Sequence, residues 1–333
     1  MATFILLGLG STVAEARDEL EAIVRKDKLS ASDRATIESE VNRRARRLEE
    51  SAGKARQLRE ARDILTATAK VSKASADGLQ TYAEAVTQKL SPLAATHDLA
   101  LGLEVVEVLA ILNHPATAEA LAAALTSPNS AVRLRAAVAI RNMHSRLLTD
   151  RAACRMVLSA LGRAGATEKN DVTLRGIYGA ISFGDGAPSA QLDDEIAAAL
   201  CEIFPRRSAM LQAGSGDEWA DTPGFEAAGR VFANAADARK KQLVSYLLDF
   251  LERHVDRYAS PDTAPEYIPT LAAATRALEQ TLRTALQSAN LSAPSTLASA
   301  KMSERRTDAS RKAVQSALSD WREAFSKSPW AVP

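Results

Sequence analysis

The chain has 333 residues, of which 46% are hydrophobic and 25% charged, and its formal net charge is +1. These values exclude collagen-like chains, disulfide-dense scaffolds and wholesale disorder, because the apolar fraction is ordinary and the charges nearly balance. Alanine is in excess with 66 residues, whereas Gly and Pro together number 27. Since alanine has the highest intrinsic helix propensity, the composition predicts an all-α protein. The length allows two domains or one elongated array.

Residues 1–16 carry the short apolar run Phe4–Leu9, followed by the small-x-small pattern Ala14-Glu15-Ala16. The run is too short to span a bilayer, which takes about 20 apolar residues. The pattern is typical of the end of a secretory signal peptide, although a basic segment before the apolar run is missing. We therefore expect a signal-peptide remnant and a periplasmic or secreted protein. The alternative is an N-terminal helix that packs its apolar run into the core of a cytoplasmic protein.

Residues 17–75 form a charge-dense segment in which Gly53 is the only helix breaker before Lys73. The polar run that leads into Asp33 offers N-cap side chains, so the sequence predicts helices over 17–28 and 33–71. Apolar residues recur every three or four positions along the second helix, namely Ile37, Val41, Ala45, Leu48, Ala52, Ala55, Leu58, Ile64 and Leu65. This narrow, alanine-rich face is typical of a coiled-coil arm or a helical hairpin that another surface must cover.

Four arginines, Arg43, Arg44, Arg46 and Arg47, form the densest basic cluster. Because they spread around the helix and acidic residues follow at once, the pattern favours a solvated helix laced with ion pairs. Contact with an acidic partner surface, including the net-negative residues 74–300 of the chain itself, is the second interpretation. Binding to nucleic acid is disfavoured, since it usually requires a clearly basic domain.

Residues 99–143 are predicted to form a buried helix followed by a pair of helices. The run Leu99–Leu112 is apolar on more than one face, which is typical of a helix buried between neighbours. After a short helix at 116–125, a tight turn at 126–130 leads into a helix at 131–143. The helix–turn–helix resembles a HEAT repeat, in the short form also seen in phycobilisome-lyase-type proteins. The residues that carry the resemblance are Pro128, Asn129, Val132, Arg133, Ala136, Ala137, Ala139 and Ile140.

Two weaker copies extend this pattern, so we expect HEAT-like repeats over 76–210, with a specific match only over 97–184. A shift of 31 positions places the small pair and its neighbours on Val105, Val106, Val108 and Leu109. That period suits a stacked helical repeat. Gly102 stands in this copy where the pattern has an arginine. A second echo, Leu174-Arg175, lies 42 positions downstream of Val132-Arg133.

The remaining sequence predicts a Gly-rich acidic loop with a short helix over 211–235 and a C-terminal helical bundle over 236–333. The Gly-rich stretch Ala213–Gly224 gathers three acidic residues around Trp219. We expect it to be a solvated insertion; partner contact through Trp219, or a cation site, are the alternatives. Further helices are expected at about 149–162, 171–183, 191–204, 236–258, 266–288 and 303–326, and the last three are longer than repeat helices.

No catalytic, cofactor-binding or metal-ligating residue is predicted. The four histidines show no metal-ligand spacing, and no nucleophile motif is present. We interpret His114, which precedes a proline, as a helix cap and His254 as a surface residue. Cys154 and Cys201 lie in apolar helical stretches and are expected to be buried thiols, with a single disulfide as the alternative.

The sequence therefore predicts an N-terminal helical arm, a short HEAT-like α-solenoid and a C-terminal set of longer helices. Resemblance to HEAT-repeat proteins implies a non-enzymatic scaffold for protein–protein interaction, although fold alone does not fix function. HEAT-like repeats also occur in chromophore lyases and DNA glycosylases, which are the alternatives. A lyase needs a polar concave pocket that the sequence does not locate, and a glycosylase needs a basic concave face. The partner and the oligomeric state stay open.

Overall fold

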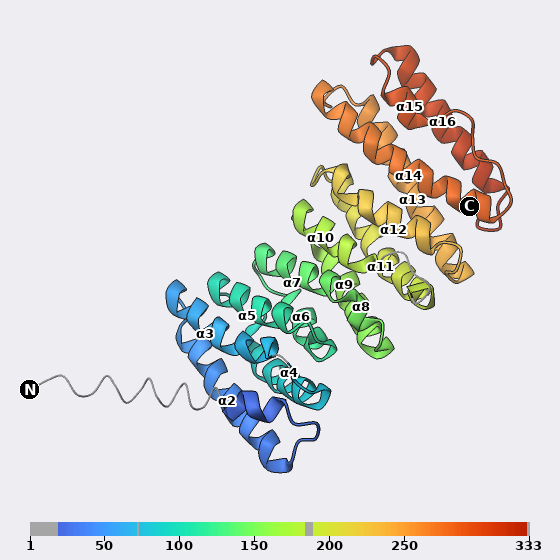
Figure 1. Ribbon diagram of the computed structural model, residues 1–333. Coiled ribbons are helices and arrows are strands. Elements are labelled where there is room, and N and C mark those ends of the chain that lie inside the picture. The colour runs from blue at the N-terminus through green and yellow to red at the C-terminus, as the bar shows by residue number, and fades with distance from the viewer. Residues whose placement is uncertain (1–18, 72, 184–188, 332–333) are drawn as a thin grey trace, which may run out of the picture. The chain divides into compact units, whose positions relative to one another are not determined.

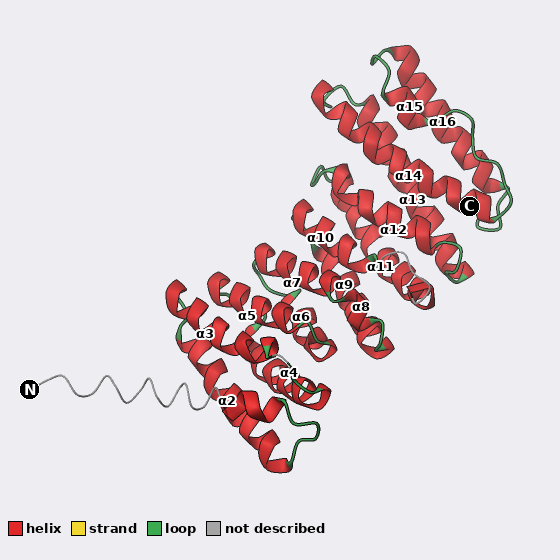
Figure 2. Cartoon of the chain, in the orientation of Figure 1, coloured by secondary structure: helices red, strands yellow, loops and turns green. Residues whose placement is uncertain are grey.

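The computed structural model describes residues 19–71, 73–183 and 189–331, and within these ranges every regular element is helical (Figure 2). The all-α prediction is confirmed. The chain divides into two compact units, Met1–Ala153 and Cys154–Pro333, which we treat separately. The signal-like pattern of residues 1–16 and the glycine-rich residues 184–188 lie outside the described residues. No helix in the described ranges is both long enough and apolar enough to cross a bilayer.

The Met1–Ala153 unit arranges its helices in two layers (Figure 1). In one layer α4 packs against both α2 and α6, and in the other α5 packs against both α3 and α7. Residues 19–24 are also helical, and this helix ends at Val24, before the expected end at Lys28. The elements are α2 (Ala31–Glu50), α3 (Ala55–Ala67), η1 (Thr68–Lys70), α4 (Ala76–Leu90), η2 (Ser91–Leu93), α5 (Leu99–Leu112), η3 (Pro115–Thr117), α6 (Ala118–Ala124), α7 (Ser130–Asn142) and α8 (His144–Leu147).

The prediction of one long helix over 33–71 is wrong, because the chain turns back between α2 and α3. Gly53 adopts a φ of +75°, in the left-handed region that an L-residue with a side chain enters only at a cost. The two helices pack against each other as a hairpin. The expected N-cap is confirmed: Ser30 accepts a hydrogen bond from the Asp33 amide, which completes a capping box. Within the unit α4 packs on α2 and α5 packs on α3, so most of the predicted apolar face is buried, whereas Ala52 and Ala55 near the turn are exposed.

Replacing Gly53 with alanine is expected to destabilise the hairpin by about 1–2 kcal/mol, the cost of a left-handed conformation in a residue with a Cβ atom. A Cβ placed there meets no atom within 4 Å, so the effect comes from the backbone alone. Hydrogen exchange of the α2 and α3 amides measures the change. Gly53→Asn should cost clearly less, since asparagine tolerates this region. Equal losses in both variants would exclude the left-handed turn as the cause.

The positions that resemble a HEAT repeat lie where α7 packs on its neighbours. The apolar ones, Val132, Ala136, Ala137, Ala139 and Ile140, are buried. Arg133 donates from its Nη1 to the carbonyls of Ser127 and Pro128 at 2.8 and 3.0 Å. The side-chain amide of Asn129 donates to the carbonyl of His97 at 3.1 Å. Backbone carbonyls therefore hold the side chains of Arg133 and Asn129, while the apolar residues pack between the helices.

The earlier copy of the pattern, in α5, buries the corresponding positions Val105, Val106, Val108 and Leu109. Its deviation from the pattern, Gly102, lies where α5 approaches α7. A Cβ at Gly102 would lie 3.0 Å from a methyl carbon of Val132. The absence of a side chain at this position therefore matches the close approach of the two helices.

The Cys154–Pro333 unit also has two layers. In one, α12 packs against α10 and α14; in the other, α13 packs against α11 and α16. The expected helix end at Phe204 is wrong: α11 continues through Pro205, although proline supplies no amide hydrogen there. The elements are α9 (Arg151–Thr167), α10 (Asp171–Ile181), η4 (Ser189–Leu192), α11 (Asp193–Gln212), η5 (Glu218–Asp221), α12 (Thr222–Val231), α13 (Asp237–Ala259), η6 (Pro265–Tyr267), α14 (Ile268–Ser288), α15 (Ala298–Met302) and α16 (Asp308–Ser326).

The aromatic residues concentrate in this unit, since thirteen of the fifteen in the chain lie in residues 154–333. Phe204 contacts the rings of Tyr178, Phe225 and Phe250 at centroid distances of 5.5–6.2 Å. Such tilted and edge-on contacts stabilise a core beyond the area that they bury. Residues far apart in the sequence thus join α10, α11, α12 and α13.

A buried carboxylate organises the C-terminal helices. Glu279 of α14 accepts hydrogen bonds from the Ala298 amide at 2.7 Å, the Ser299 amide at 3.1 Å and the Trp321 indole at 3.0 Å. These donors come from α15 and α16. Because every bond converges on one side chain, Glu279 fixes the register of the three helices.

Candidate interaction surfaces

The Trp219 patch consists of the half-buried Trp219 and the exposed Val172 and Arg175. The guanidinium carbon of Arg175 lies 4.9 Å from the centroid of the Trp219 ring, and its Nη1 donates to the Trp219 carbonyl at 3.0 Å. Val172, nearly one turn earlier on α10, is 54% exposed and is one of two large hydrophobic residues exposed to that degree among the described residues. Tryptophan and arginine are the side chains most enriched at protein-interaction hot spots.

Arg207 holds the segment that carries Trp219 from the interior of the unit, since its own side chain is 1% exposed. Its Nε donates to both carboxylate oxygens of Asp221, at 3.0 and 3.2 Å, and its Nη2 donates to the Asp217 carbonyl at 2.8 Å. Tyr178 donates its hydroxyl to Asp221 at 3.0 Å. Asp171 adds a second carboxylate 2.8 Å from Arg207. The expectation of a solvated insertion is therefore wrong for the end of this loop.

Burial dominates the electrostatics of this cluster. It raises the pKa of Asp221 to about 6, against the opposing effect of Arg207, so the carboxyl is ionised at neutral pH. Removal from water also acts on Arg207, but Asp221 and Asp171 raise the pKa of the guanidinium above its usual value. Gly216, at a φ of +94°, covers the guanidinium so closely that a Cβ would lie 2.3 Å from Nη1. A buried pair of this kind fixes geometry more than it adds stability.

A second anchor holds the start of η5. Tyr267 donates its hydroxyl to the Glu218 carboxylate and accepts a bond from the Glu218 amide at 3.2 Å. Burial and the adjacent carboxylate both raise the pKa of Tyr267, so the phenol stays protonated. Trp219 lies between Glu218 and Asp221 in the short helix η5, so contacts on both sides of it in sequence hold its position.

A hollow of 760 Å³ lies between α10, α12 and α14. Gly179, Ser182, Gly229 and Ala277 contribute small side chains or none to its lining, and the longer side chains of Glu226, Arg230 and Gln280 complete it. Val172, Arg175, Gly179 and Ser182 follow at spacings of three and four residues, which places them on one face of the α10 segment. The hollow therefore continues the Trp219 patch along α10.

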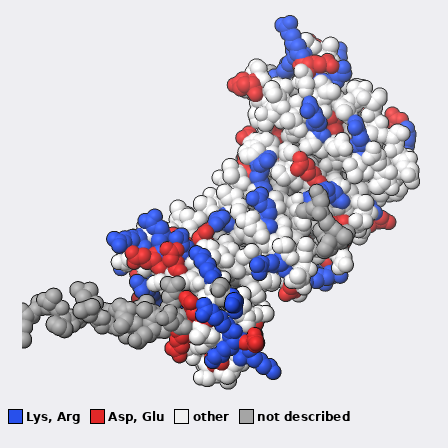
Figure 3. All heavy atoms as spheres, viewed as in Figure 1, with Lys and Arg blue, Asp and Glu red and all other residues white. Residues whose placement is uncertain are grey.

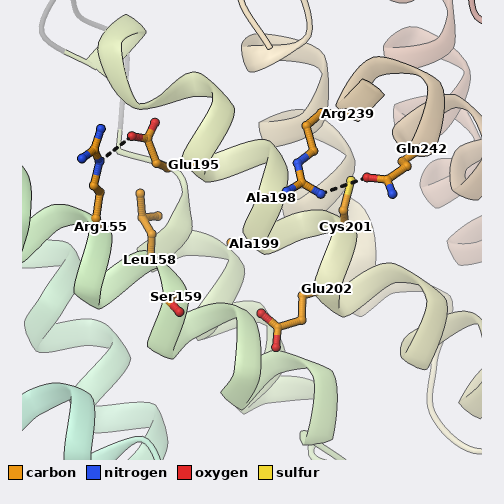
Figure 4. Close-up of a pocket in the computed structure, with 10 residues that line it drawn as sticks. All are labelled: Arg155, Leu158, Ser159, Glu195, Ala198, Ala199, Cys201, Glu202, Arg239 and Gln242. Carbon is orange, nitrogen blue, oxygen red and sulfur yellow. Dashed lines mark hydrogen bonds and ion pairs between the residues drawn. The ribbon is translucent and has the colours of Figure 1, made fainter. Parts of the chain in front are cut away.

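Figure 4 shows another hollow, of 380 Å³, between α9, α11 and α13. Two of its charged side chains pair with each other, since Arg155 donates to Glu195 at 2.8 Å, and Arg239 donates to the side-chain oxygen of the neutral Gln242 at 3.0 Å. Cys201 lines it, but burial raises the pKa of the thiol to about 12. Since the thiolate is the reactive form, this cysteine is inert at neutral pH.

The arginine cluster of α2 is divided between the interior and the surface. Arg44 is buried; its Nε donates to Glu40 at 2.6 Å and its Nη1 to the Ile64 carbonyl at 3.0 Å, which joins α2 to α3. Arg43 pairs with the same glutamate at 2.7 Å. Arg46 and Arg47 are exposed. On the face drawn in Figure 3, basic and acidic atoms of this region lie side by side, as expected for a helix laced with ion pairs.

The histidines take structural positions. His114 accepts a hydrogen bond from the Ala116 amide at 3.2 Å, so its predicted role as a cap is confirmed. The surface interpretation of His254 is wrong, because its side chain is fully buried and its Nδ1 lies 3.0 Å from the Thr275 hydroxyl. It shares the inner face of α13 with Leu247, Leu251 and Tyr258, at helical spacing.

Both cysteines are free and buried, as the sequence predicts, and the disulfide alternative is wrong. Among the described residues, no three His, Cys, Asp or Glu side chains cluster closely enough to hold a metal ion.

Arg175 and Val172 were not singled out as contact residues by the sequence. The one signal in the sequence is that Leu174-Arg175 repeats the pattern of Val132-Arg133, although the two arginines make different contacts. Arg133 bonds to its own turn, whereas Arg175 lies over Trp219.

Comparison with known proteins assigns no family. No protein-family model and no curated protein matches the chain. A solved structure described as "Computational Design of Self-Assembling Cyclic Protein Homooligomers" aligns over 95% of both chains, at 17% identity and a TM-score of 0.17. A likeness at that level supports no conclusion about this chain.

Proposed function

We propose that the protein is a non-enzymatic scaffold for protein–protein interaction, built from HEAT-like repeats and acting in the periplasm or cell envelope. The observation that carries this proposal is the Trp219 patch with its adjoining hollow. It combines an aromatic ring, an arginine and an exposed valine on one surface, and buried bonds from Arg207 and Tyr267 hold the loop in place. Preorganised side chains of this kind bind with a smaller entropic cost.

The helical packing supports the repeat part of the proposal. In the Met1–Ala153 unit the alternate helices α3, α5 and α7 lie in one layer, and in the Cys154–Pro333 unit α10, α12 and α14 do. Helices α5 and α7 bury corresponding positions 31 residues apart. In a repeat array, each unit covers the apolar face of the next, and exposed faces are free for partners. The compartment rests on the signal-like pattern of residues 1–16, which N-terminal sequencing of the mature protein would test.

The variants Trp219→Ala and Val172→Ala are expected to weaken partner binding by about tenfold or more each, because hot-spot truncations cost about 2 kcal/mol. The test is an affinity pull-down from native extract, followed by titration of the recovered partner. Leu99→Ala is the matched control, since Leu99 is the other large exposed hydrophobic residue, at 45% exposure. Undiminished binding by both patch variants would refute the role of the patch, and a chain that recovers no partner would refute the scaffold.

A further inference from the structure

Arg175 holds its guanidinium in a defined orientation at the Trp219 patch. The group lies 4.9 Å from the centroid of the Trp219 ring, and its Nη1 donates to the Trp219 carbonyl at 3.0 Å. A guanidinium carries five N–H donors in a planar fork, and stacking on an aromatic ring orients that fork. Among the described residues, no carboxylate forms an ion pair with Arg175, which is exposed. Donors of this oriented group therefore remain for another molecule.

The exposed faces of α10, α12 and α14 carry more basic than acidic residues. Glu226 is the exposed acidic residue of these faces. The other two carboxylates of these helices are paired or buried, since Asp171 contacts Arg207 and Glu279 is 2% exposed. The basic residues, of which the two on α14 form no ion pair within the described ranges, are Arg175, Arg230, Arg276 and Arg283. A surface with an excess of one charge attracts groups of the opposite sign.

The hollow of 760 Å³ between the same helices offers apolar surface. Pro223 and Ala277 contribute apolar groups to its lining. The hydroxyl of Thr281, another lining residue, already donates to the Phe225 carbonyl at 2.8 Å. An apolar side chain that enters the hollow therefore leaves this hydroxyl paired. Because the lining residue Ser182 lies two helical turns from Arg175 on α10, the hollow and the oriented guanidinium lie on the same side of that helix.

Deepening the scaffold function, on which this inference rests, we propose that this face binds an acidic segment of the partner protein, with an Asp or Glu carboxylate on Arg175 and an apolar side chain in the hollow. A carboxylate only accepts hydrogen bonds, and its two oxygens match two parallel N–H groups of a guanidinium. The basic residues of α12 and α14 attract the neighbouring acidic side chains of the segment.

A nucleic-acid strand fits the same surface less well. Strand binding combines a groove that is basic along its length with aromatic rings on which the bases stack. Here Arg175 covers a face of the Trp219 ring, and Glu226 lines the hollow. The surface therefore favours a segment in which apolar side chains separate the negative charges.

The test uses the full chain and the fluorescently labelled octapeptide Glu-Glu-Leu-Glu-Glu-Leu-Glu-Glu, with binding followed by anisotropy at about 0.15 M ionic strength. Arg175→Gln is expected to weaken binding about tenfold, because it removes a charged bidentate donor. The matched control is Arg206→Gln, since Arg206 is exposed on α11, in the other layer of the unit. It should change binding less than about twofold, because salt screens exposed charges outside the site.

Two further measurements separate recognition from general attraction. Arg175→Lys keeps the charge but loses the planar fork, so it should weaken binding about threefold or more. A peptide with serine in place of both leucines should bind about tenfold more weakly, because it has no apolar side chain to bury in the hollow. Circular dichroism and tryptophan fluorescence check that each variant keeps its fold.

Unchanged binding by Arg175→Gln, or equal weakening by Arg175→Gln and Arg206→Gln, would overturn the proposal. Absence of peptide binding would also overturn it, as would tighter binding of a labelled oligothymidylate. The scaffold function fails separately. A native partner that is lost by Trp219→Ala but retained by Arg175→Gln would leave the scaffold standing and overturn this inference. Peptide binding that depends on Arg175, in a chain that recovers no partner, would support the acidic-segment site and refute the scaffold.

Discussion

Replacing Asp221 with alanine is expected to lower the free energy of unfolding of the Cys154–Pro333 unit by about 3–5 kcal/mol, because it leaves a buried charge without its partner. Arg207 is 1% exposed, and its Nε donates only to Asp221. Tyr178 loses its acceptor in the same variant. The carboxylate of Asp171 remains beside Nη2 and compensates in part. The loss should rank among the largest for any single substitution in this unit.

Urea unfolding followed by tryptophan fluorescence measures this change selectively, since all three tryptophans lie in residues 154–333. Tyr178→Phe removes one hydrogen bond and should cost only about 1 kcal/mol. The double variant Arg207→Met/Asp221→Leu should recover part of the loss, because it removes the unpaired buried charge but leaves Tyr178 and Asp171 without these partners. An Asp221→Ala variant that unfolds within about 1 kcal/mol of the native chain would show that the pair is not buried as described.

The helical class and the apolar faces could be predicted from the sequence because they depend on local periodicity. The buried positions of α7, from Val132 to Ile140, follow the spacing of a helix packed on one side. The cap at Ser30 and the turn at Pro128 use side chains that bond within a few residues of themselves. Such interactions are readable without knowing which helix lies alongside.

The errors arose where a distant partner decides the environment. Asp221 looks solvated in a glycine-rich loop, but its partners are 14 and 43 residues away, in α11 and α10. The charged neighbours of His254 suggest a surface, but the histidine itself faces α14. At Gly53, a single glycine in a strongly helical pattern was tolerated in the prediction, whereas the packing of α2 on α3 makes it the turn.

The Trp219 patch was likewise predictable only in the part that depends on local sequence. Trp219 was identifiable from the sequence as a lone aromatic in an exposed stretch. Its companions Arg175 and Val172 come from α10, about 45 residues earlier, and only the fold brings them together. Composition does not predict this surface, because the contact of Arg175 with Trp219 depends on the fold.

Acidification is expected to destabilise the Cys154–Pro333 unit through His254, whose pKa burial lowers to about 3. The unfolded chain binds a proton at this residue below about pH 6.5, whereas the folded chain does not. The stabilising contribution of neutral His254 is therefore complete above that pH and is lost as pH falls toward 3. The slope is about 1.4 kcal/mol per pH unit, so the loss at pH 4.5 reaches about 2.7 kcal/mol.

The titration of Asp221 stabilises the folded state as pH falls, opposite to that of His254. The contribution of His254 is therefore measured as the difference between the native chain and a variant at His254. Burial raises the pKa of Asp221 to about 6, so the folded state gains a proton before the unfolded state does as pH falls. The native chain can thus show a shallow profile even though both groups titrate. In His254→Gln, the loss at low pH should disappear, and its stability relative to the native chain should rise by about 2–3 kcal/mol between pH 7 and pH 4.5.

Thr275→Val provides the control, because it removes the hydrogen bond of His254 but leaves the imidazole buried. This variant should be less stable than the native chain at every pH and should keep the same pH dependence. Parallel profiles for His254→Gln and the native chain would mean that the imidazole takes up its proton without unfolding. A buried neutral histidine requires the profiles to diverge only below about pH 6.5, and that onset distinguishes its titration from a general effect of the substitution.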